Sequence, residues 1–162
     1  MDANVCRSQL ERLLRDETTL LLQLETQLDA EHALLKANDI EGLDRAGAAR
    51  QDTVAKLLRI DDERRQLCRM SGRSEDQFGL GALLRWCDPT SSLHDAYQRC
   101  AAQAQRCREH NDRNGALVTA RLNRVSGMLR QLNPSTESRT YAPKHGAASP
   151  HVQAGRMLTV RA

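Results

Sequence analysis

Hydrophobic residues recur every three or four positions along three long stretches of this chain. That spacing places them on one face of an α-helix, which has about 3.6 residues per turn. The first stretch runs from about residue 4 to residue 36. The positions along its face are Leu10, Leu14, Glu17, Leu21, Leu24, Leu28, Glu31 and Leu35. This leucine-rich pattern predicts a long amphipathic helix with a coiled-coil-like face.

Asn38 and Asp39 interrupt the pattern and separate the first helix from a second one. The carboxylate of Asp39 is well placed to accept hydrogen bonds from the first free amides of a helix that begins at Ile40. The apolar face of this second helix is thinner than that of the first, and it ends near residues 71–72. Small residues at positions 46–49 leave open whether the helix is broken there.

The connection between residues 71 and 90 contains several glycines and a proline, which interrupt regular helix. Within it, Ser74 and Gln77 resemble a capping box, a pair of side chains that satisfy the amides at a helix start. They predict a short helix that carries Leu80, Leu83, Leu84 and Trp86. We expect its apolar side chains to plug one end of a helical bundle.

The third and longest stretch runs from Ser91 to Leu132. A hydroxyl of Ser91 or Ser92 is expected to cap its start, and Pro134 ends it near residue 133, because proline cannot continue a helix. The positions along its face are Leu93, Tyr97, Cys100, Ala104, Cys107, Asn111, Asn114, Val118, Leu122, Val125, Leu129 and Leu132. The first half of this face is built from small residues and the second half from leucine, valine and methionine. A helix of roughly 60 Å needs partner helices, and we expect it to run antiparallel to its predecessors.

These elements predict an all-α fold, an elongated antiparallel helical bundle of three long helices with a short connecting helix. Helix-favouring residues dominate the composition, and β-branched and aromatic residues are few. The predicted bundle domain covers residues 1–133. Residues 134–162 are rich in Ser, Gly, Pro and Ala, which predicts a disordered, flexible basic tail. Two short apolar islands, residues 140–143 and 157–160, lie within that tail.

The charge of the chain is unevenly placed. The tail carries four basic residues and one acidic residue, 4 − 1 = +3, which equals the formal net charge of the whole chain. Residues 1–132 carry 20 basic and 20 acidic groups and are neutral. A neutral body with few aromatic residues argues against nucleic-acid binding. No apolar stretch has the length of a signal peptide or a membrane span, and five cysteines without framework spacing suit a reducing cytoplasm.

The sequence predicts no enzyme, no metal site and no cofactor. Cys100, Cys107 and His110 share a helix face, but zinc needs four ligands, and small buried cysteines on a packing face explain the pattern better. Glu17 and Glu31 lie roughly 21 Å apart along a helix, too far for shared acid–base chemistry. The pair Asn111 and Asn114 falls on the face of the last helix. An asparagine there most simply fixes the register between packed helices, and a ligand site is the alternative.

The run from His110 to Val118, continued by Leu122, Val125, Leu129 and Leu132, resembles the C-terminal helix of the FlgN family. The order of the predicted helices fits the same family, and so does a tail that contains Thr140, Tyr141 and Gly146. This resemblance implies a cytoplasmic chaperone of flagellar type III export, which holds hook-associated proteins of the hook–filament junction before secretion. No cofactor is implied.

The resemblance also implies roles for individual residues. The surface that binds the client would be formed by Asn111, Asn114, Val118, Leu122, Val125 and Leu129, and Tyr141 would contact the export gate. A leucine-lined helix suits this role, because it can cover the apolar face of a client helix. The alternative is a structural coiled-coil subunit, a homo-oligomer whose apolar faces pair only with copies of itself.

Overall fold

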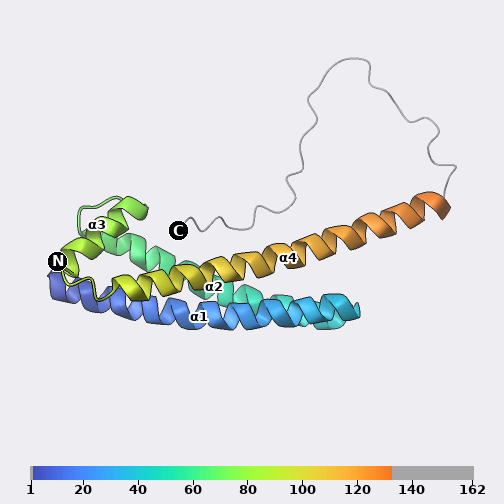
Figure 1. Cartoon of the computed structure of the whole chain (residues 1–162), viewed down its shortest axis with the longest axis horizontal. Helices are drawn as coiled ribbons and strands as arrows, with labels where there is room; N and C mark the ends of the chain where they lie inside the picture. Colours follow the sequence, from blue (N-terminus) through green and yellow to red (C-terminus); the bar gives the residue numbers. More distant parts are fainter. Residues whose placement is uncertain (1, 133–162) are drawn as a thin grey trace, which may run out of the picture. The chain divides into compact units, whose positions relative to one another are not determined.

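The computed structural model describes residues 2–132, and this part of the chain is all-α. It contains the helices α1 (Ala3–Ala37), α2 (Ile40–Met70), α3 (Gln77–Cys87) and α4 (His94–Leu132), and no strand (Figure 1). Three long helices and a short connecting one confirm the predicted fold class. The predicted tail, its boundary at residues 133 and 134, and Tyr141 lie outside the described residues. The chain divides into two units, Met1–Val118 and Thr119–Ala162.

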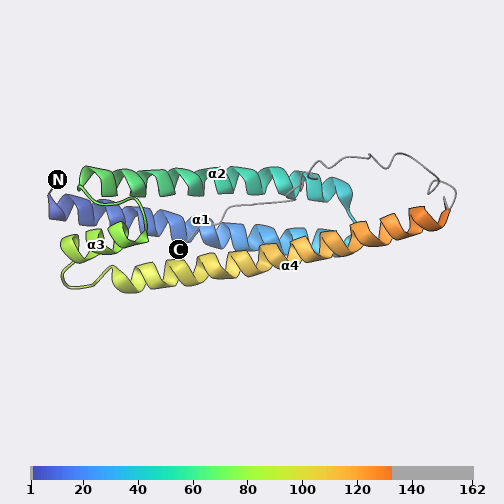
Figure 2. The same cartoon turned by 90° about the horizontal axis from the view of Figure 1, so that it is seen from above.

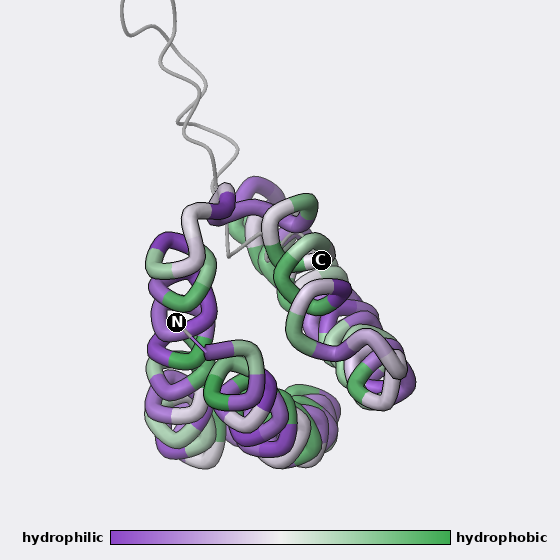
Figure 3. Tube along the Cα trace, turned by 90° about the vertical axis from the view of Figure 1, so that its left-hand side faces the viewer, coloured by the Kyte–Doolittle hydropathy of each residue, from purple (hydrophilic) through white to green (hydrophobic). Residues whose placement is uncertain are grey.

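The core of the first unit is built around α1, which runs antiparallel beside α2, and it also includes side chains from α2, from α3 and from the first part of α4 (Figures 1 and 2). The leucine face of α1 is buried there, as its spacing predicts; Leu10, Leu13 and Leu28 are among the largest fully enclosed side chains. Every helix carries hydrophobic and hydrophilic positions in alternation, which is visible when the tube is coloured by hydropathy (Figure 3). Burial of this leucine face is the main favourable contribution to folding.

The turn between α1 and α2 follows the sequence closely. Asn38 adopts the left-handed conformation, with φ of 60°, which asparagine tolerates better than most residues. The Asp39 carboxylate accepts a hydrogen bond from the Gly42 amide at 2.9 Å, so the predicted cap is confirmed. α2 then continues without interruption to Met70, so the break left open at positions 46–49 does not occur.

The two glutamates on the leucine face of α1 each pair with an arginine of α2. Arg64 lies 2.8 Å from Glu17, and Arg50 lies 2.8 Å from Glu31. Arg64 also contacts Asp61 at 2.9 Å. Because all of these side chains are largely buried, each charge depends on its partner for solvation.

We expect Arg64→Ala to lower the free energy of unfolding by about 2 kcal/mol, because it leaves Glu17 without its partner in a shielded position. Chemical denaturation followed by circular dichroism measures this loss. The matched control is Arg12→Ala, which removes an exposed pair with Glu63 and should lower the free energy of unfolding much less. Equal losses for the two variants would contradict this ranking.

The short helix α3 covers the end of the α1–α2 pair where α1 begins (Figure 2). Leu80, Leu83 and Cys87 are buried in the same core cluster as Cys6 of α1, and Leu84 is partly buried, so this part of the predicted plug is present. Trp86 does not belong to it, since its side chain is 41% exposed. The residue that caps the start of α3 differs from the prediction. The Asp76 carboxylate accepts the hydrogen bond from the Gly79 amide, and the Ser74 hydroxyl donates to Asp76 instead of capping the helix. A carboxylate accepts more strongly than a hydroxyl, which favours Asp76 as the cap.

The predicted direction of α4 is wrong with respect to α1. Within the first unit α4 runs antiparallel to α2 but parallel to α1, because α2 brings the chain back to the end where α1 begins and the short α3 stays at that end (Figure 2). Contacting residues advance in the same direction along both helices: Cys107 of α4 donates to the Leu21 carbonyl of α1, and seven residues further along each helix Asn114 donates to the Leu28 carbonyl.

The start of α4 is also capped by a residue other than the predicted serines. The buried carboxylate of Asp88 accepts a hydrogen bond from the Leu93 amide at 2.6 Å, and the hydroxyls of Ser92 and Thr90 donate to it. Arg7 of α1 lies 3.6 Å from the same carboxylate. Asp88 therefore joins the α3–α4 connection to both α4 and α1.

Candidate functional site

The last turns of α4 carry apolar side chains that remain on the surface. None of the described residues of the second unit, Thr119–Leu132, is buried. Five apolar side chains at helical spacing are 49% to 79% exposed, a group that we call the terminal stripe: Leu122, Val125, Met128, Leu129 and Leu132. A run of exposed apolar side chains on one helix face is typical of a surface that binds another protein.

Val118, the last residue of the first unit, is also 40% exposed. Four of the sequence-predicted site residues, Val118, Leu122, Val125 and Leu129, thus lie on the surface at successive helical positions. Met128 and Leu132 are also apolar and exposed, and the predicted set of site residues did not include them. Their spacing from Val125 and Leu129 is the signal that could have added them.

Asn114 has a different environment. Its side chain is buried, its amide nitrogen donates to the Leu28 carbonyl at 2.8 Å, and its amide oxygen lies 2.9 Å from Nδ1 of His32. Both polar groups are therefore used against α1, as a residue that fixes register would use them. Asn111, one turn earlier, is half-buried. We do not retain Asn114 in the client surface.

Polar contacts join α4 to α1 over the turns that precede Asn114. Gln103 donates to Glu25 at 2.7 Å, and Arg113 lies 2.8 Å from Asp29. The hydrogen bond from Arg113 lowers the pKa of Asp29. These contacts fix the position of α4 along α1 without the broad leucine packing that joins α1 to α2.

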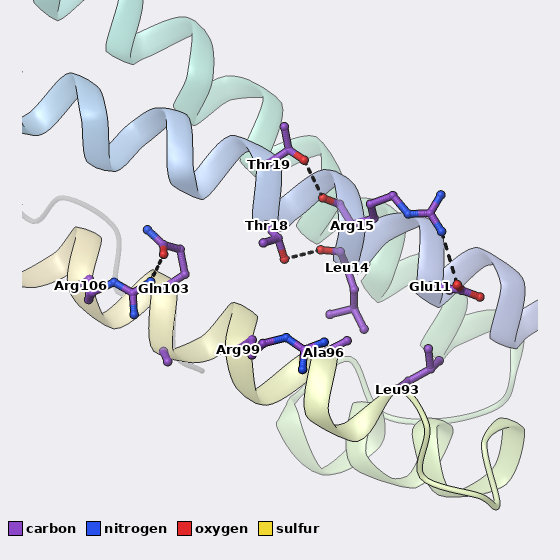
Figure 4. Close-up of a pocket in the computed structure, with 11 residues that line it drawn as sticks. Glu11, Leu14, Arg15, Thr18, Thr19, Leu93, Ala96, Arg99, Gln103 and Arg106 are labelled. Atoms are coloured by element: carbon purple, nitrogen blue, oxygen red, sulfur yellow. Dashed lines mark hydrogen bonds and ion pairs between the residues drawn. The ribbon is translucent and has the colours of Figure 1, made fainter.

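A groove of about 660 Å³ lies between α1 and the first half of α4 (Figure 4). Its floor includes Leu14 and Leu93, which are each only 5% exposed. Its rim is polar and includes Arg15, which pairs with Glu11, and Arg106, which contacts Gln103. Since the apolar floor is already buried, this groove offers a guest helix less hydrophobic surface than the terminal stripe.

The cysteines contribute to packing, as the sequence predicts for Cys100 and Cys107. All are buried and none is in a disulfide bond. Cys107 donates to the Leu21 carbonyl, and the described residues hold no cluster of histidine, cysteine and carboxylate side chains suited to a metal ion. Burial raises the pKa of the Cys6 and Cys100 thiols to about 12, so both remain protonated at neutral pH.

We therefore expect the thiols to be inert in the native protein. A thiol-reactive dye should label none of the five cysteines within minutes at pH 8 and all five after unfolding in guanidinium chloride, because the thiolate is the reactive form. Mass spectrometry of the labelled chain counts the modified sites. Rapid labelling of Cys100 in the native protein would contradict the burial described here.

Comparison with models of protein families identifies the family of this chain. The family model described as FlgN protein matches residues 1–149, which is most of its length. The chain belongs to the FlgN family. The search of curated proteins and the search of solved structures give no match.

FlgN proteins are flagellar export chaperones, and this family contains binding proteins rather than enzymes. Its members bind substrates of the flagellar export system. In this FlgN chain none of the four described helices is both long enough and apolar enough to cross a membrane. An exposed apolar surface on a helix is the kind of feature that a chaperone of this family requires.

Proposed function

We propose that this chain is a cytoplasmic chaperone that binds hook-associated proteins of the hook–filament junction before their flagellar type III export. The terminal stripe and Val118 form the client surface. Membership in the FlgN family supports the chaperone role. The observation that carries the proposal for the site is the exposure of every apolar side chain in the last turns of α4.

The physical argument is that a client helix covers what the chaperone's own helices leave exposed. An unassembled junction protein has terminal segments whose apolar helical faces would pair prematurely. Packing such a face against the terminal stripe removes apolar surface of both proteins from water. No nucleotide is required for this binding, and release is coupled to the export machine. Tyr141 remains our proposed contact to the export gate, on the basis of the family resemblance.

The experiment that tests this function is co-expression of the full chain with the hook-associated proteins of its own flagellar system. We expect one of these proteins to co-elute with the chain from a size-exclusion column in a fixed stoichiometry. The hook protein and the filament protein of the same system serve as controls and should elute separately. Failure of every hook-associated protein to co-elute would contradict the proposal.

The alternative is a coiled-coil subunit that pairs through the same apolar surface with copies of itself. Sedimentation velocity of the purified chain separates the two functions. Self-association that Leu122→Asp abolishes, without any client binding, would favour the structural subunit.

A further inference from the structure

The groove between α1 and the first half of α4 lies within the first unit and is cationic. Arg15 of α1 and both Arg99 and Arg106 of α4 line it, and Glu11 is the only carboxylate among the residues that do (Figure 4). The lining therefore has a formal net charge of 3 − 1 = +2. The first unit as a whole carries 17 basic groups and 20 carboxylates, 17 − 20 = −3. The charge of the groove is thus opposite to that of the unit that contains it.

Arg99 is the arginine of this groove that has no partner in the described part of the chain. Its side chain is exposed, and it makes no ion pair within residues 2–132. Asp95 lies one turn earlier on α4 but does not pair with it. The five N–H donors of this guanidinium are therefore open to a carboxylate from another molecule.

The other two arginines are engaged only in part. Arg15 contacts Glu11 at 3.3 Å, and Arg106 contacts Glu25 at 3.3 Å and also donates to Gln103. Both arginine side chains are more than half exposed, and ion pairs at such positions are weak. Each guanidinium can therefore donate further hydrogen bonds to a guest.

The spacing of the arginines indicates the length of this guest. Arg99 and Arg106 are seven residues apart, so they lie on one face of α4 and are separated by about 10 Å along its axis. The short side chains of Ala102, Thr18 and Thr19 line the groove as well and leave its volume of about 660 Å³ open. A peptide with acidic residues separated along its chain spans this distance, whereas a small dicarboxylic acid is too short.

We propose that this groove binds an acidic peptide segment of a partner protein. Its carboxylates pair with Arg99 and Arg106, and its apolar atoms lie over Ala96 and Ala102. This second binding surface does not rest on the function proposed for the terminal stripe. The chain's own residues 133–162 carry a net charge of +3, which the groove repels. A nucleic acid or an anionic membrane is less favoured, because affinity for either grows with the number of basic contacts and the groove offers three.

The test uses the full chain and three matched peptides of about ten residues, in which the same positions are all glutamate, all glutamine or all lysine. Nuclear magnetic resonance of the isotope-labelled chain gives the dissociation constants. We expect the glutamate peptide to bind about tenfold more tightly than the glutamine peptide, and the lysine peptide not to bind. The largest changes in chemical shift should fall on the amides of Thr18, Thr19, Ala96 and Ala102. The preference should shrink in about 0.5 M salt, which screens exposed charges.

Two variants identify the cation responsible. Arg99→Gln should weaken binding of the glutamate peptide about fivefold, because it removes the guanidinium that has no other partner. The matched control Arg59→Gln removes the same charge from an exposed position of α2 outside the groove and should leave the affinity unchanged. Circular dichroism checks that both variants are folded. Equal affinities for the glutamate and glutamine peptides would overturn the inference, and so would equal losses in the two variants.

Other occupants of the groove give different results. Succinate that binds as tightly as the glutamate peptide would overturn the inference in favour of a free small anion. Self-association that Arg99→Gln abolishes, without binding of the peptide, would overturn it in favour of a second copy of the chain.

The groove can also be separated from the client surface. The variant Leu122→Asp with Leu129→Asp should bind the glutamate peptide as the native chain does. Loss of peptide binding in this variant would place the peptide on the terminal stripe and overturn the inference. If the hook-associated proteins do not bind while the glutamate peptide still does, the proposed function is wrong and the acidic-peptide site stands.

Discussion

Leu122→Asp combined with Leu129→Asp should abolish client capture without unfolding the protein. Both leucines lie on the exposed face of α4, at 62% and 60% exposure, so their replacement removes little packing within the chain. Two carboxylates in the centre of the apolar surface would have to be desolvated when a client helix covers it, which costs several kcal/mol. We expect the affinity for the hook-associated client to fall by at least about a hundredfold.

Isothermal titration calorimetry measures the affinity, and far-UV circular dichroism with thermal melting measures the fold. The matched control is Leu22→Asp combined with Leu58→Asp, which places two carboxylates on exposed leucines of α1 and α2. This control should bind the client normally. If the Leu122 and Leu129 variant loses helicity and its cooperative melt, these leucines belong to a core and the client surface lies elsewhere.

Helical periodicity predicted α1 well because one continuous leucine face determines which of its residues are buried. A face with leucine at six of eight positions has only one stable arrangement, against another helix, and the buried positions of α1 follow it. The same reasoning placed the short helix α3 and the cap at Asp39. These features depend on local spacing, which is fully visible in the sequence.

The candidate site was predicted in part for the same reason. Periodicity places Val118, Leu122, Val125 and Leu129 on one face, but it gives the same face to Cys100 and Asn114, which are buried. The difference arises from tertiary packing, because Cys100 and Asn114 are covered by α1 within the first unit. Periodicity identifies a face, and only the structure tells which part of that face is already covered.

Polar contacts between residues far apart in the chain could not be predicted from the sequence. Arg64 and Glu17 are 47 positions apart, and nothing local indicates that they meet. The direction of α4 depended on which end of the bundle α3 covers, a property of the whole fold. The sequence offered Ser91 or Ser92 as the cap of α4, whereas Asp88 accepts the Leu93 amide and also contacts Arg7, which is distant in sequence.

Asp88→Ala should destabilise the protein by about 3 kcal/mol. The change removes the acceptor of the Leu93 amide and of two hydroxyls, and hydrogen bonds to a charged group each contribute about 1.5–3 kcal/mol, less than additively. Urea denaturation followed at 222 nm measures the loss. The control is Asp76→Ala, which removes the exposed cap of α3 and should destabilise the protein clearly less than Asp88→Ala.

The contribution of Asp88 should also depend on pH in a defined direction. Burial raises the pKa of this carboxyl, but the donors from Leu93, Ser92 and Thr90 together with Arg7 outweigh it, so the pKa is lowered. The carboxyl of Asp88 therefore binds a proton more readily in the unfolded chain than in the folded one. Its contribution to the free energy of unfolding is complete above its ordinary pKa of about 3.9, and it is lost as the pH falls through the lower pKa that the group has in the folded protein. The stability difference between the native protein and Asp88→Asn should therefore be constant from pH 7 to about pH 5 and should shrink below about pH 4. A difference that stays constant down to pH 3 would show that the charge of Asp88 contributes nothing and that its hydrogen-bonding shape alone holds the start of α4.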